Sequence, residues 1–232
     1  MAKTQNWEDE GNIHIGMANK PQILPYHKLI AELAIKYTNE GDSILDIGCG
    51  RGQLPAQITQ LGKRDLIVAD AYQVCLDETS AAANIKKTYL IGEKEFDIDT
   101  KIDGGPYDMV ILSHVLEHLP HPIEAIQKIK RLTKPGGIII LAVPNPVRPN
   151  ILISNIFRRH YVNRGHIHAW DMSHWRNFLE NINDLDVVEY AHDFIQIPGC
   201  YRLPILQQVG KGLACIVPWW SFSNIAIIRH KG

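Results

Sequence analysis

The first 145 residues alternate between short runs of mostly apolar residues and longer segments in which apolar residues recur every third or fourth position. The apolar runs cover residues 43–47, 65–70, 88–91, 107–113 and 138–143. The segments with helical spacing cover residues 26–37, 54–61, 72–83 and 122–132. Continuously apolar strands are typical of a parallel sheet that helices cover on both faces. The pattern therefore predicts an α/β protein with a doubly wound sheet.

Glycine and proline residues fit the ends of these elements. Gly41 and Gly62 each follow a segment with helical spacing, where glycine commonly ends a helix. Pro122 stands at the start of the last such segment, a position that proline favours. Residues 134–137 (Lys-Pro-Gly-Gly) follow that segment, so we expect a turn there and a strand that begins at residue 138.

Beyond Asn145 the alternation is less regular, and proline, histidine and aromatic residues become frequent. We expect a lid or cap in this part, around residues 160–174. The remaining periodic segments predict a helix near 173–181 and strands near 187–192 and 224–229, which would complete the sheet.

The charges of the chain nearly cancel, since 24 Lys and Arg residues oppose 25 Asp and Glu residues for a formal net charge of −1. With 45% hydrophobic and 21% charged residues, the composition excludes a disordered, collagen-like or coiled-coil protein. A chain with nearly balanced charges is not expected to have the broad positive surface that is typical of nucleic-acid-binding proteins. We therefore expect no nucleic-acid partner.

The distribution of cysteine and of apolar residues bears on location. Cys49, Cys75, Cys200 and Cys215 are too scattered for a disulfide framework, which favours a reducing compartment. The first ten residues are polar and acidic, unlike a secretory signal. The apolar stretch 203–220 is interrupted by proline, glutamine and lysine, so it is not expected to span a membrane. The sequence predicts a cytoplasmic protein.

The strongest chemical signal is the segment Ile44–Gly52, which reads ILDIGCGRG. Three glycines at alternate positions between a strand and a helix let the backbone turn tightly and let a ligand approach it closely. The dinucleotide pattern G-x-G-x-x-G is not met, because Gln53 stands where it requires the third glycine. Asp46, inside the strand before the loop, favours a ligand with a cationic or amino group.

Asp70 ends the second strand of the pattern. Its distance from the glycine loop is close to the roughly 20 residues at which an acidic side chain reaches ribose hydroxyls in nucleotide-binding sheets. A glycine turn or a strand-end aspartate alone is often only structural. A glycine loop followed by an aspartate at the end of the next strand favours a ligand that contains ribose.

Four segments together resemble the class I S-adenosylmethionine-dependent methyltransferases, in particular methyltransferase types 11 and 23. They are Ile44–Gly52, Asp70, Tyr107–Leu119 and Leu132–Gly137. The resemblance covers roughly residues 26–145 and follows the family's order of motifs. It implies a Rossmann-like α/β fold of three α/β/α layers, with seven mostly parallel strands and an antiparallel last strand.

The resemblance also implies the cofactor S-adenosyl-L-methionine, which becomes S-adenosyl-L-homocysteine when it gives up its methyl group. The residues that it assigns to the cofactor are Asp46, Gly48, Cys49, Gly50, Gly52, Asp70, Ala71, Asp97, Ser113 and His114. Among them, the glycine loop and the aspartate before it would hold the methionine part, and Asp70 the ribose. Asp97, or alternatively Asp99, would contact adenine, while Ser113 and His114 would lie beside the reacting centre.

We interpret residues 1–232 as a single methyltransferase domain. In this interpretation residues 26–145 bind the cofactor, and residues 146–222 supply a lid, acceptor-binding insertions and the last strands. The aromatic segments 161–175 and 203–222 are the candidates for the acceptor pocket. The tryptophans of these segments either line the acceptor pocket or belong to the core. They are Trp170, Trp175, Trp219 and Trp220. The basic residues Arg148, Arg158, Arg159, His160 and Arg164 either bind an anion or form a solvated face.

Methyl transfer from a sulfonium is an in-line displacement, so the protein needs a base only if the acceptor must lose a proton. Histidine titrates near neutrality and is the natural candidate. The candidate catalytic residues are His114, His118, His166 and His168. For His118 we favour a packing or capping role, because the Glu-His-Leu segment occurs in many members of the family.

His114, Glu117 and His118 have the spacing that would bring three metal ligands together on a helical turn. Ubiquinone-pathway O-methyltransferases and small-RNA 2′-O-methyltransferases have a similar Glu-x-x-Glu-His element that binds a divalent metal, and the latter have a further downstream histidine. This chain has His114 where those families have glutamate. Segments of the form Ser-x-x-x-Glu-His without a metal are commoner, so we expect none and keep these residues as candidates.

The sequence thus predicts an S-adenosylmethionine-dependent methyltransferase that acts on a small molecule at oxygen, with a sugar-containing or quinone-like acceptor. One alternative is metal-assisted 2′-O-methylation of RNA, against which the neutral net charge speaks. Another is a cofactor-binding partner subunit without catalysis, against which the intact glycine loop and Asp70 speak.

Overall fold

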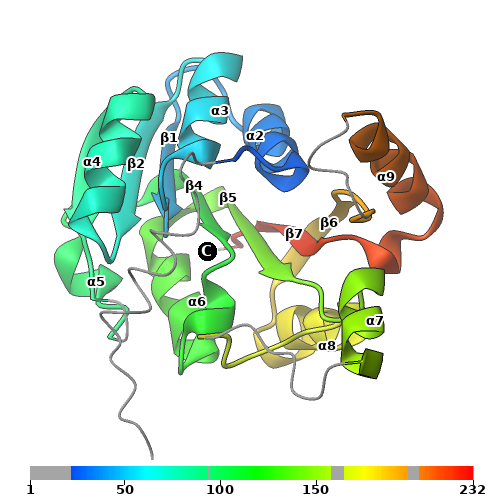
Figure 1. Ribbon diagram of the computed structural model, residues 1–232. Coiled ribbons are helices and arrows are strands. Elements are labelled where there is room, and N and C mark those ends of the chain that lie inside the picture. Colours follow the sequence, from blue (N-terminus) through cyan, green and yellow to red (C-terminus); the bar gives the residue numbers. More distant parts are fainter. Residues whose placement is uncertain (1–21, 93–94, 158–164, 198–203, 232) are drawn as a thin grey trace, which may run out of the picture.

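The computed structural model describes residues 22–92, 95–157, 165–197 and 204–231, which form a seven-stranded sheet (Figure 1). The strands lie in the order β3-β2-β1-β4-β5-β7-β6. Their bounds are β1 (Ser43–Ile47), β2 (Asp65–Asp70), β3 (Ile85–Leu90), β4 (Tyr107–Ser113), β5 (Thr133–Pro144), β6 (Asp186–His192) and β7 (Ser223–Arg229). Neighbouring strands pair in parallel except at β7, which runs antiparallel to both β5 and β6. The predicted doubly wound fold is confirmed.

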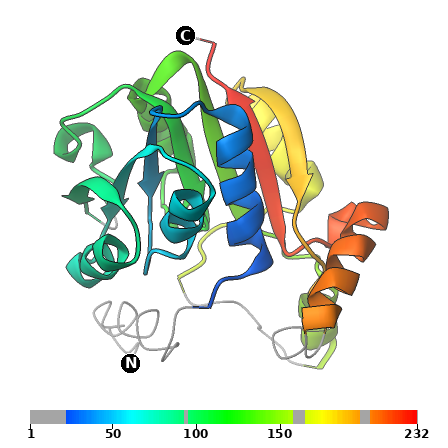
Figure 2. The same ribbon diagram turned by 90° about the horizontal axis from the view of Figure 1, so that it is seen from above.

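Helices cover both faces of the sheet, so the molecule has three layers (Figure 2). The helices of the described residues are α2 (Pro25–Tyr37), α3 (Gln53–Leu61), α4 (Gln73–Ala82), α5 (Ile98–Lys101), η1 (Leu116–His118), α6 (Pro122–Leu132), α7 (Pro149–Phe157), α8 (Met172–Arg176), η2 (Asn177–Ile182), α9 (Pro204–Ile216) and η3 (Pro218–Trp220). Helices α2, α3 and α4 pack on one face of the sheet. Helices α5, α6, α8 and η2 pack on the other.

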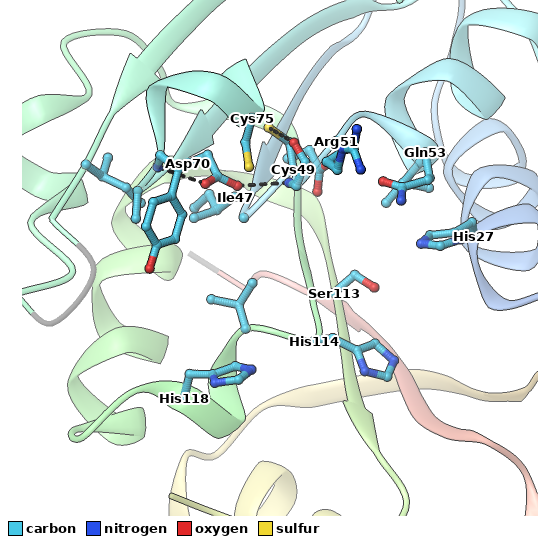
Figure 3. A pocket seen from close by; sticks show the side chains of 18 of the residues that line it. His27, Ile47, Cys49, Arg51, Gln53, Asp70, Cys75, Ser113, His114 and His118 are labelled. Atoms are coloured by element: carbon cyan, nitrogen blue, oxygen red, sulfur yellow. Dashed lines mark hydrogen bonds between the residues drawn. The ribbon is translucent and has the colours of Figure 1, made fainter. Parts of the chain in front are cut away.

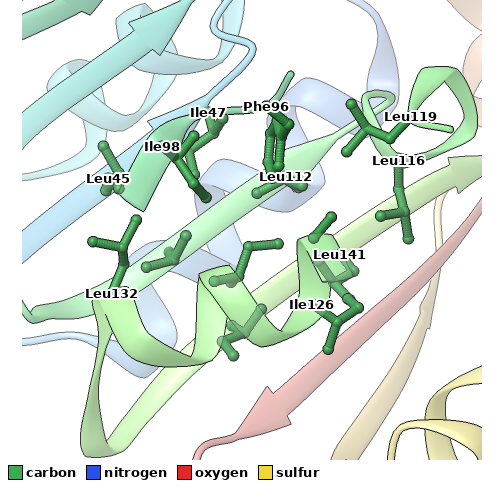
Figure 4. Packing of buried hydrophobic residues seen from close by; sticks show 14 of the residues in the cluster. Leu45, Ile47, Phe96, Ile98, Leu112, Leu116, Leu119, Ile126, Leu132 and Leu141 are labelled. Atoms are coloured by element: carbon green, nitrogen blue, oxygen red, sulfur yellow. The ribbon is translucent and has the colours of Figure 1, made fainter. Parts of the chain in front are cut away.

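The alternation of side chains along each strand explains why the strands are apolar throughout. Leu45 and Ile47 of β1 belong to the core cluster on the face of the sheet that α6 covers, and Ile126 of α6 belongs to the same cluster (Figure 4). Ile44, one position before Leu45, points to the opposite face and belongs to the same cluster as Ile30 of α2. Because both faces are covered, both sets of alternate positions are mostly apolar.

The boundary of β5 differs from the prediction. The strand begins at Thr133, which pairs with Tyr107, and the next paired residue is Ile138, opposite Met109. The intervening residues bulge from the ladder, and Gly136 takes a left-handed backbone conformation with φ of 78°. The predicted turn at 134–137 is therefore an irregularity inside the strand, since the chain already pairs with β4 before it turns.

The less regular second half adds helices around the last strands. The helix predicted near 173–181 consists of α8 and the π-helical segment η2. Strands β6 and β7 lie within one residue of their predicted positions. Part of the expected lid, residues 160–164, lies outside the described residues. No helix in the described part of the chain is long and apolar enough to cross a membrane.

Candidate active site

A cavity of about 560 Å³ opens at the carboxyl ends of the parallel strands. Its lining comes from the loops that follow β1, β2, β3 and β4, and from the start of α2. Figure 3 shows the glycine loop and Asp70 on one side of the cavity, with Ser113, His114 and His118 across from them. This is the edge at which doubly wound sheets bind ligands, and the volume suits a cofactor-sized molecule.

The glycine loop requires glycine at specific positions. Gly48 has φ of 77°, and a Cβ atom there would lie 2.2 Å from Cγ2 of Val115. Gly52 has φ of 84°, and a Cβ atom there would lie 2.8 Å from Cα of Thr79. These glycines let the loop pack against the β4 loop and against α4. Gly48, Cys49 and Gly50 line the cavity, whereas Gly52 supports the loop from behind.

Asp70 is tied to the glycine loop as well as to its own strand end. One carboxylate oxygen, Oδ2, accepts a hydrogen bond from the Gly50 amide at 2.9 Å, and Oδ1 accepts one from the Tyr72 amide at 3.0 Å. Burial raises the pKa of this carboxyl above its ordinary value, while the amides that donate to it oppose that shift. Asp70 and Ala71 both line the cavity, where the sequence places the ribose.

The carboxylate of Asp46 is buried, and one of its oxygens lacks a hydrogen-bond partner among the described residues. The residue is 2% exposed and lines the cavity, and the oxygen without a partner is Oδ2. Burial raises the pKa of Asp46 to about 7, and the nearby Asp70 adds to the shift. A buried carboxylate without a partner is costly unless a cation or a donor meets it. The site is therefore suited to a ligand that brings a positive charge to Asp46.

The acidic residues predicted for adenine lie beside the cavity and do not line it. Asp97 accepts a hydrogen bond at Oδ1 from the amide of Gly92 at 2.7 Å, so it shapes the loop after β3. Asp99 pairs with Lys128 at 3.3 Å on the surface of α6. The described residues that line this end of the cavity are Ile91, Gly92 and Phe96. The assignment of an acid to adenine thus stays a prediction.

His114 lines the cavity in a constrained position. Its backbone has φ of 58°, its Nε2 atom is 2.9 Å from Oγ of Ser223, and its ring centroid is 4.6 Å from that of Tyr26. Burial, together with the neighbouring cations, lowers the pKa of His114 to about 3. The imidazole is therefore neutral at physiological pH, and it is a weak base whose main contribution is orientation by hydrogen bonding.

Glu117 is the centre of a second cluster beside the cavity. It is 1% exposed, and both of its carboxylate oxygens lack a hydrogen-bond partner among the described residues. Its Oε1 atom is 3.8 Å from Nδ1 of His114, 3.8 Å from Nε2 of His118 and 3.9 Å from Nε2 of His166. Burial raises the pKa of Glu117 to about 8. Three imidazoles thus surround one buried carboxyl group.

The tautomer of His118 follows from its other contact. Nδ1 of His118 lies 3.1 Å from the carbonyl oxygen of Gly165, which only accepts, so Nδ1 carries the proton. Nε2 of His118 then faces the carboxyl group of Glu117 at 3.8 Å. Ligand atoms of Glu117, His118 and His166 lie within 4.8 Å of one another. Such a group fits a cation between its members.

The structure changes the predicted set of metal candidates. It keeps Glu117 and His118 and adds His166 to the group, in place of His114. The predicted helical turn is absent here, because residues 116–118 form a short 3-10 helix and His114 is held by Ser223 instead. The Glu117 carbonyl accepts hydrogen bonds from the amides of Ile167 and His168, and this brings the distant segment to the cluster.

The remaining predicted residues fall into three environments. His168 stacks on Trp170 at 5.3 Å between ring centroids and is not a member of the Glu117, His118 and His166 group. Trp170 and Trp175 belong to the core, whereas the other two tryptophans of the prediction, Trp219 and Trp220, are exposed. Arg148 is buried with its guanidinium 4.1 Å from the Phe222 ring centroid, so the solvated-face interpretation is wrong for it. The other basic residues, Arg158, Arg159, His160 and Arg164, lie outside the described residues.

Sequence reasoning missed the contribution of α2. Tyr26 and His27 line the cavity from the start of this helix. Nδ1 of His27 accepts a hydrogen bond from the Leu24 amide at 2.9 Å, and burial lowers the pKa of His27 to about 4. The apolar spacing of the segment revealed the helix but gave no signal of what its first turn faces. A histidine and a tyrosine at a helix start are the only local sign.

A glycine-loop cavity at the carboxyl ends of a seven-stranded sheet with this strand order defines a class I S-adenosylmethionine-dependent methyltransferase fold. A family model described as a methyltransferase domain matches residues 21–190. The chain therefore belongs to the methyltransferase domain family.

Known proteins resemble the chain over different lengths. It is 30% identical over 154 residues to the ubiquinone biosynthesis O-methyltransferase of Rickettsia bellii. The matched region covers 65% of this chain and 61% of that protein. The chain spans about half the length of other curated relatives that it matches.

Two solved structures share the fold. One is a protein in complex with the Trm112 methyltransferase activator of Haloferax volcanii, with a TM-score of 0.65, 16% identity and coverage of 97% of this chain and 96% of that chain. The other is magnesium protoporphyrin IX methyltransferase from Synechocystis PCC 6803 with bound S-adenosylhomocysteine, with a TM-score of 0.61, 15% identity and coverage of 96% and 95%.

Proposed function

We propose that the protein transfers a methyl group from S-adenosylmethionine to an oxygen atom of a small molecule. The observation that carries this proposal is the buried carboxylate of Asp46 beside the glycine loop, whose Oδ2 atom has no hydrogen-bond partner among the described residues. The amino group of the cofactor's methionine part would supply the positive charge that this carboxylate lacks. Asp70, across the loop, would receive the ribose hydroxyls, since it lines the cavity and its carboxylate oxygens are hydrogen-bond acceptors.

Calorimetry with S-adenosylhomocysteine tests the cofactor part of the proposal. We expect saturable binding of one molecule per chain, and competition by S-adenosylmethionine at the same site. Transfer of labelled methyl groups to phenolic or sugar hydroxyls, measured by mass spectrometry, tests the acceptor part. Absence of binding to both cofactor forms would contradict the proposal as a whole, whereas methylation only at nitrogen would contradict the oxygen acceptor.

Cofactor affinity should depend on pH through Asp46. Its pKa of about 7 in the free protein is above the ordinary value of 3.8, so at pH 6 most molecules hold a proton that a cationic ligand must displace. We expect the affinity for S-adenosylhomocysteine to rise about tenfold from pH 6 to pH 8 and to level off above. Asp46→Asn should weaken binding and flatten this profile in titration calorimetry. The exposed Asp77→Asn serves as control and should retain it.

The acceptor is proposed to be small and to carry a hydroxyl group, with sugar-containing and quinone-like molecules as the favoured classes. The ubiquinone biosynthesis O-methyltransferases, at about 30% identity, support methylation at oxygen. We further propose that residues 26–145 bind the cofactor and that residues 146–222 bind the acceptor within a single domain. A cytoplasmic location is part of the proposal, because Cys49, Cys75 and Cys215 are free thiols.

The group of Glu117, His118 and His166 is proposed to hold a divalent cation. A carboxylate and two imidazoles are a common ligand set for such ions, and a cation would satisfy the two buried oxygens of Glu117. A bound cation would supply Lewis acidity that makes a hydroxyl group of the acceptor easier to ionise. The protein's own residues fix the group, since Gly165 orients His118 and the Glu117 carbonyl anchors the segment that carries His166.

Binding of Mn²⁺ tests this cation site without an activity assay. We expect the electron paramagnetic resonance signal of free Mn²⁺ to fall on titration with the protein, and His166→Ala to weaken binding by at least about tenfold. His168→Ala is the matched control, because His168 lies two residues away and stacks on Trp170 outside the group. Equal binding by both variants and the wild type would exclude His166 as a ligand. Methyl transfer should fall with a chelator and return with Mg²⁺ or Mn²⁺.

A further inference from the structure

His114 lines the cavity, but the contact that fixes its ring comes from β7, beyond β5 in the sheet. Its Nε2 atom is 2.9 Å from Oγ of Ser223, which begins β7 and is fully buried. Its Nδ1 atom is 3.8 Å from Oε1 of Glu117, which is beyond hydrogen-bonding distance. A neutral imidazole carries its proton on one nitrogen and accepts a hydrogen bond at the other. What His114 offers to a molecule in the cavity therefore depends on the direction of its hydrogen bond with Ser223.

The backbone of His114 is held as firmly as its ring. Its φ of 58° is a left-handed conformation that residues other than glycine rarely take, and such conformations persist where the surrounding contacts enforce them. The amide of His114 donates to the carbonyl oxygen of Ala142 in β5 at 2.8 Å. The main chain and the Nε2 atom are thus both fixed by the strands that follow β4 in the sheet.

Asp193, directly after β6, fixes the start of β7. It is 5% exposed, and its Oδ1 atom accepts hydrogen bonds from the amides of Phe194, Phe222 and Ser223 at 2.6, 2.9 and 3.2 Å. The last two of these amides belong to the residues that lead into β7 and begin it. The carboxyl group therefore holds the backbone of Ser223 in place, and with it the hydroxyl group that meets His114.

The same carboxyl group sets the direction of the hydrogen bond between Ser223 and His114. Burial raises the pKa of Asp193 to about 6, while the amides that donate to it and the Ser223 hydroxyl oppose that shift. At neutral pH the carboxyl group is mostly ionised and can only accept. Its Oδ2 atom has no hydrogen-bond partner among the described residues, and a buried negative oxygen attracts a hydroxyl proton. The Ser223 proton therefore turns toward Asp193, and the Ser223 oxygen accepts from Nε2 of His114.

The opposite tautomer of His114 would weaken contacts on both sides of the ring. With the proton on Nδ1, Nε2 would have to accept from the Ser223 hydroxyl, and the buried carboxylate of Asp193 would lose that proton. The Nδ1 proton would then face Glu117 from 3.8 Å, too far for a hydrogen bond. The observed distances therefore favour the tautomer with its proton on Nε2.

We propose that Asp193 is a positioning residue that, through Ser223, holds His114 with its proton on Nε2 and leaves Nδ1 to accept a hydrogen bond from the hydroxyl group that is methylated. The proposal rests on the proposed function and adds to it the group that orients the methyl acceptor. A hydroxyl that donates to Nδ1 turns an oxygen lone pair toward the methyl group of the sulfonium. As this lone pair forms the new C–O bond, the electron pair of the S–C bond returns to sulfur, and the hydroxyl proton passes by way of Nδ1 to water.

Nuclear magnetic resonance of the full chain labelled with nitrogen-15 at histidine tests the proposal without cofactor or acceptor. Long-range proton–nitrogen spectra distinguish a protonated ring nitrogen from an unprotonated one, and the His114 signals are those lost in His114→Gln. We expect the wild type to carry the His114 proton on Nε2 at neutral pH. Asp193→Asn should move that proton to Nδ1. Its amide oxygen would still accept from the three backbone amides at the Oδ1 position, so its NH₂ group would donate to Ser223 and turn the Ser223 proton toward His114.

Asp186→Asn is the matched control, because Asp186 begins the same strand that Asp193 follows. Its Oδ1 atom lies 3.7 Å from Nζ of Lys231 near the surface, and this variant should keep the wild-type tautomer. In transfer of labelled methyl groups to phenol, Asp193→Asn should lower kcat by at least about tenfold and change the KM for S-adenosylmethionine by less than about twofold. Asp186→Asn should change neither.

Ser223→Ala provides a second test that does not depend on the folding of Asp193→Asn. It removes the acceptor of the Nε2 proton, so exchange of that proton with water should become at least about tenfold faster. The proposal would be overturned by a wild-type His114 protonated on Nδ1, by the wild-type tautomer in Asp193→Asn, or by unchanged proton exchange in Ser223→Ala. If the wild type transferred no methyl group, the proposed function would be contradicted, and the proton positions would still decide the role of Asp193.

Discussion

Replacing Asp70 with alanine is expected to weaken the binding of S-adenosylhomocysteine by about 1–3 kcal/mol, which is roughly 5- to 150-fold. The carboxylate is buried, lines the cavity and faces the proposed position of the ribose. Removal of a buried acceptor leaves the ribose hydroxyls without their partner, and it also frees the Gly50 amide that shapes the glycine loop. Titration calorimetry at a fixed pH measures the change.

The same strand supplies the control for this experiment. Asp65 begins β2 and Asp70 ends it, and Asp65 is engaged in an exposed ion pair with Lys86. Asp65→Ala should leave the affinity for S-adenosylhomocysteine unchanged, because the residue lies at the opposite edge of the sheet. If Asp70→Ala bound the ligand as the wild type does, Asp70 would have to be removed from the proposed site.

Replacing Trp175 with alanine should lower the free energy of unfolding by about 3–5 kcal/mol. The side chain is fully buried, and its ring lies 5.9 Å from that of Phe178 at an interplanar angle of 11°. Loss of the indole would leave a large cavity between α8, η2 and the sheet. Trp175→Phe should cost less, because it keeps an aromatic ring and removes an indole N–H that has no hydrogen-bond partner among the described residues.

Urea denaturation followed by circular dichroism measures these differences. Trp219→Ala is the matched control, since this tryptophan is 54% exposed, and its unfolding free energy should stay within about 0.5 kcal/mol of the wild type. A similar loss for both tryptophans would contradict the assignment of Trp175 to the core and of Trp219 to the surface.

The fold was predictable because its signal is local. Strands such as 138–143 are apolar throughout, and that pattern alone indicates cover on both faces. The glycine loop was predictable for a related reason, since the alternate glycines needed there follow one another in the sequence. The boundary of β5 was less accessible, because the pairing of Thr133 with Tyr107 depends on the neighbouring strand and not on the residues of the turn.

The site was only partly predictable, because several of its contacts join distant parts of the chain. The spacing of His114, Glu117 and His118 indicated a group, but the grouping with His166 depends on backbone hydrogen bonds between Glu117 and residues 167–168. Whether a tryptophan belongs to the core or lines a pocket depends on its burial, and the composition of the sequence does not show burial. The same holds for Arg148, whose guanidinium packs over an aromatic ring in place of facing water.

The position of β7 has a consequence for synthesis on the ribosome. β6 is made before β7, yet β7 lies between β6 and β5 and is antiparallel to both. β6 therefore cannot join the sheet until the residues up to Arg229 have left the exit tunnel, and until then β5 is an unpaired edge with three consecutive isoleucines, 138–140. Such an edge readily pairs with other chains. A nascent protein with this topology is most vulnerable to aggregation just before its sheet closes, which makes this interval the natural point for chaperone action.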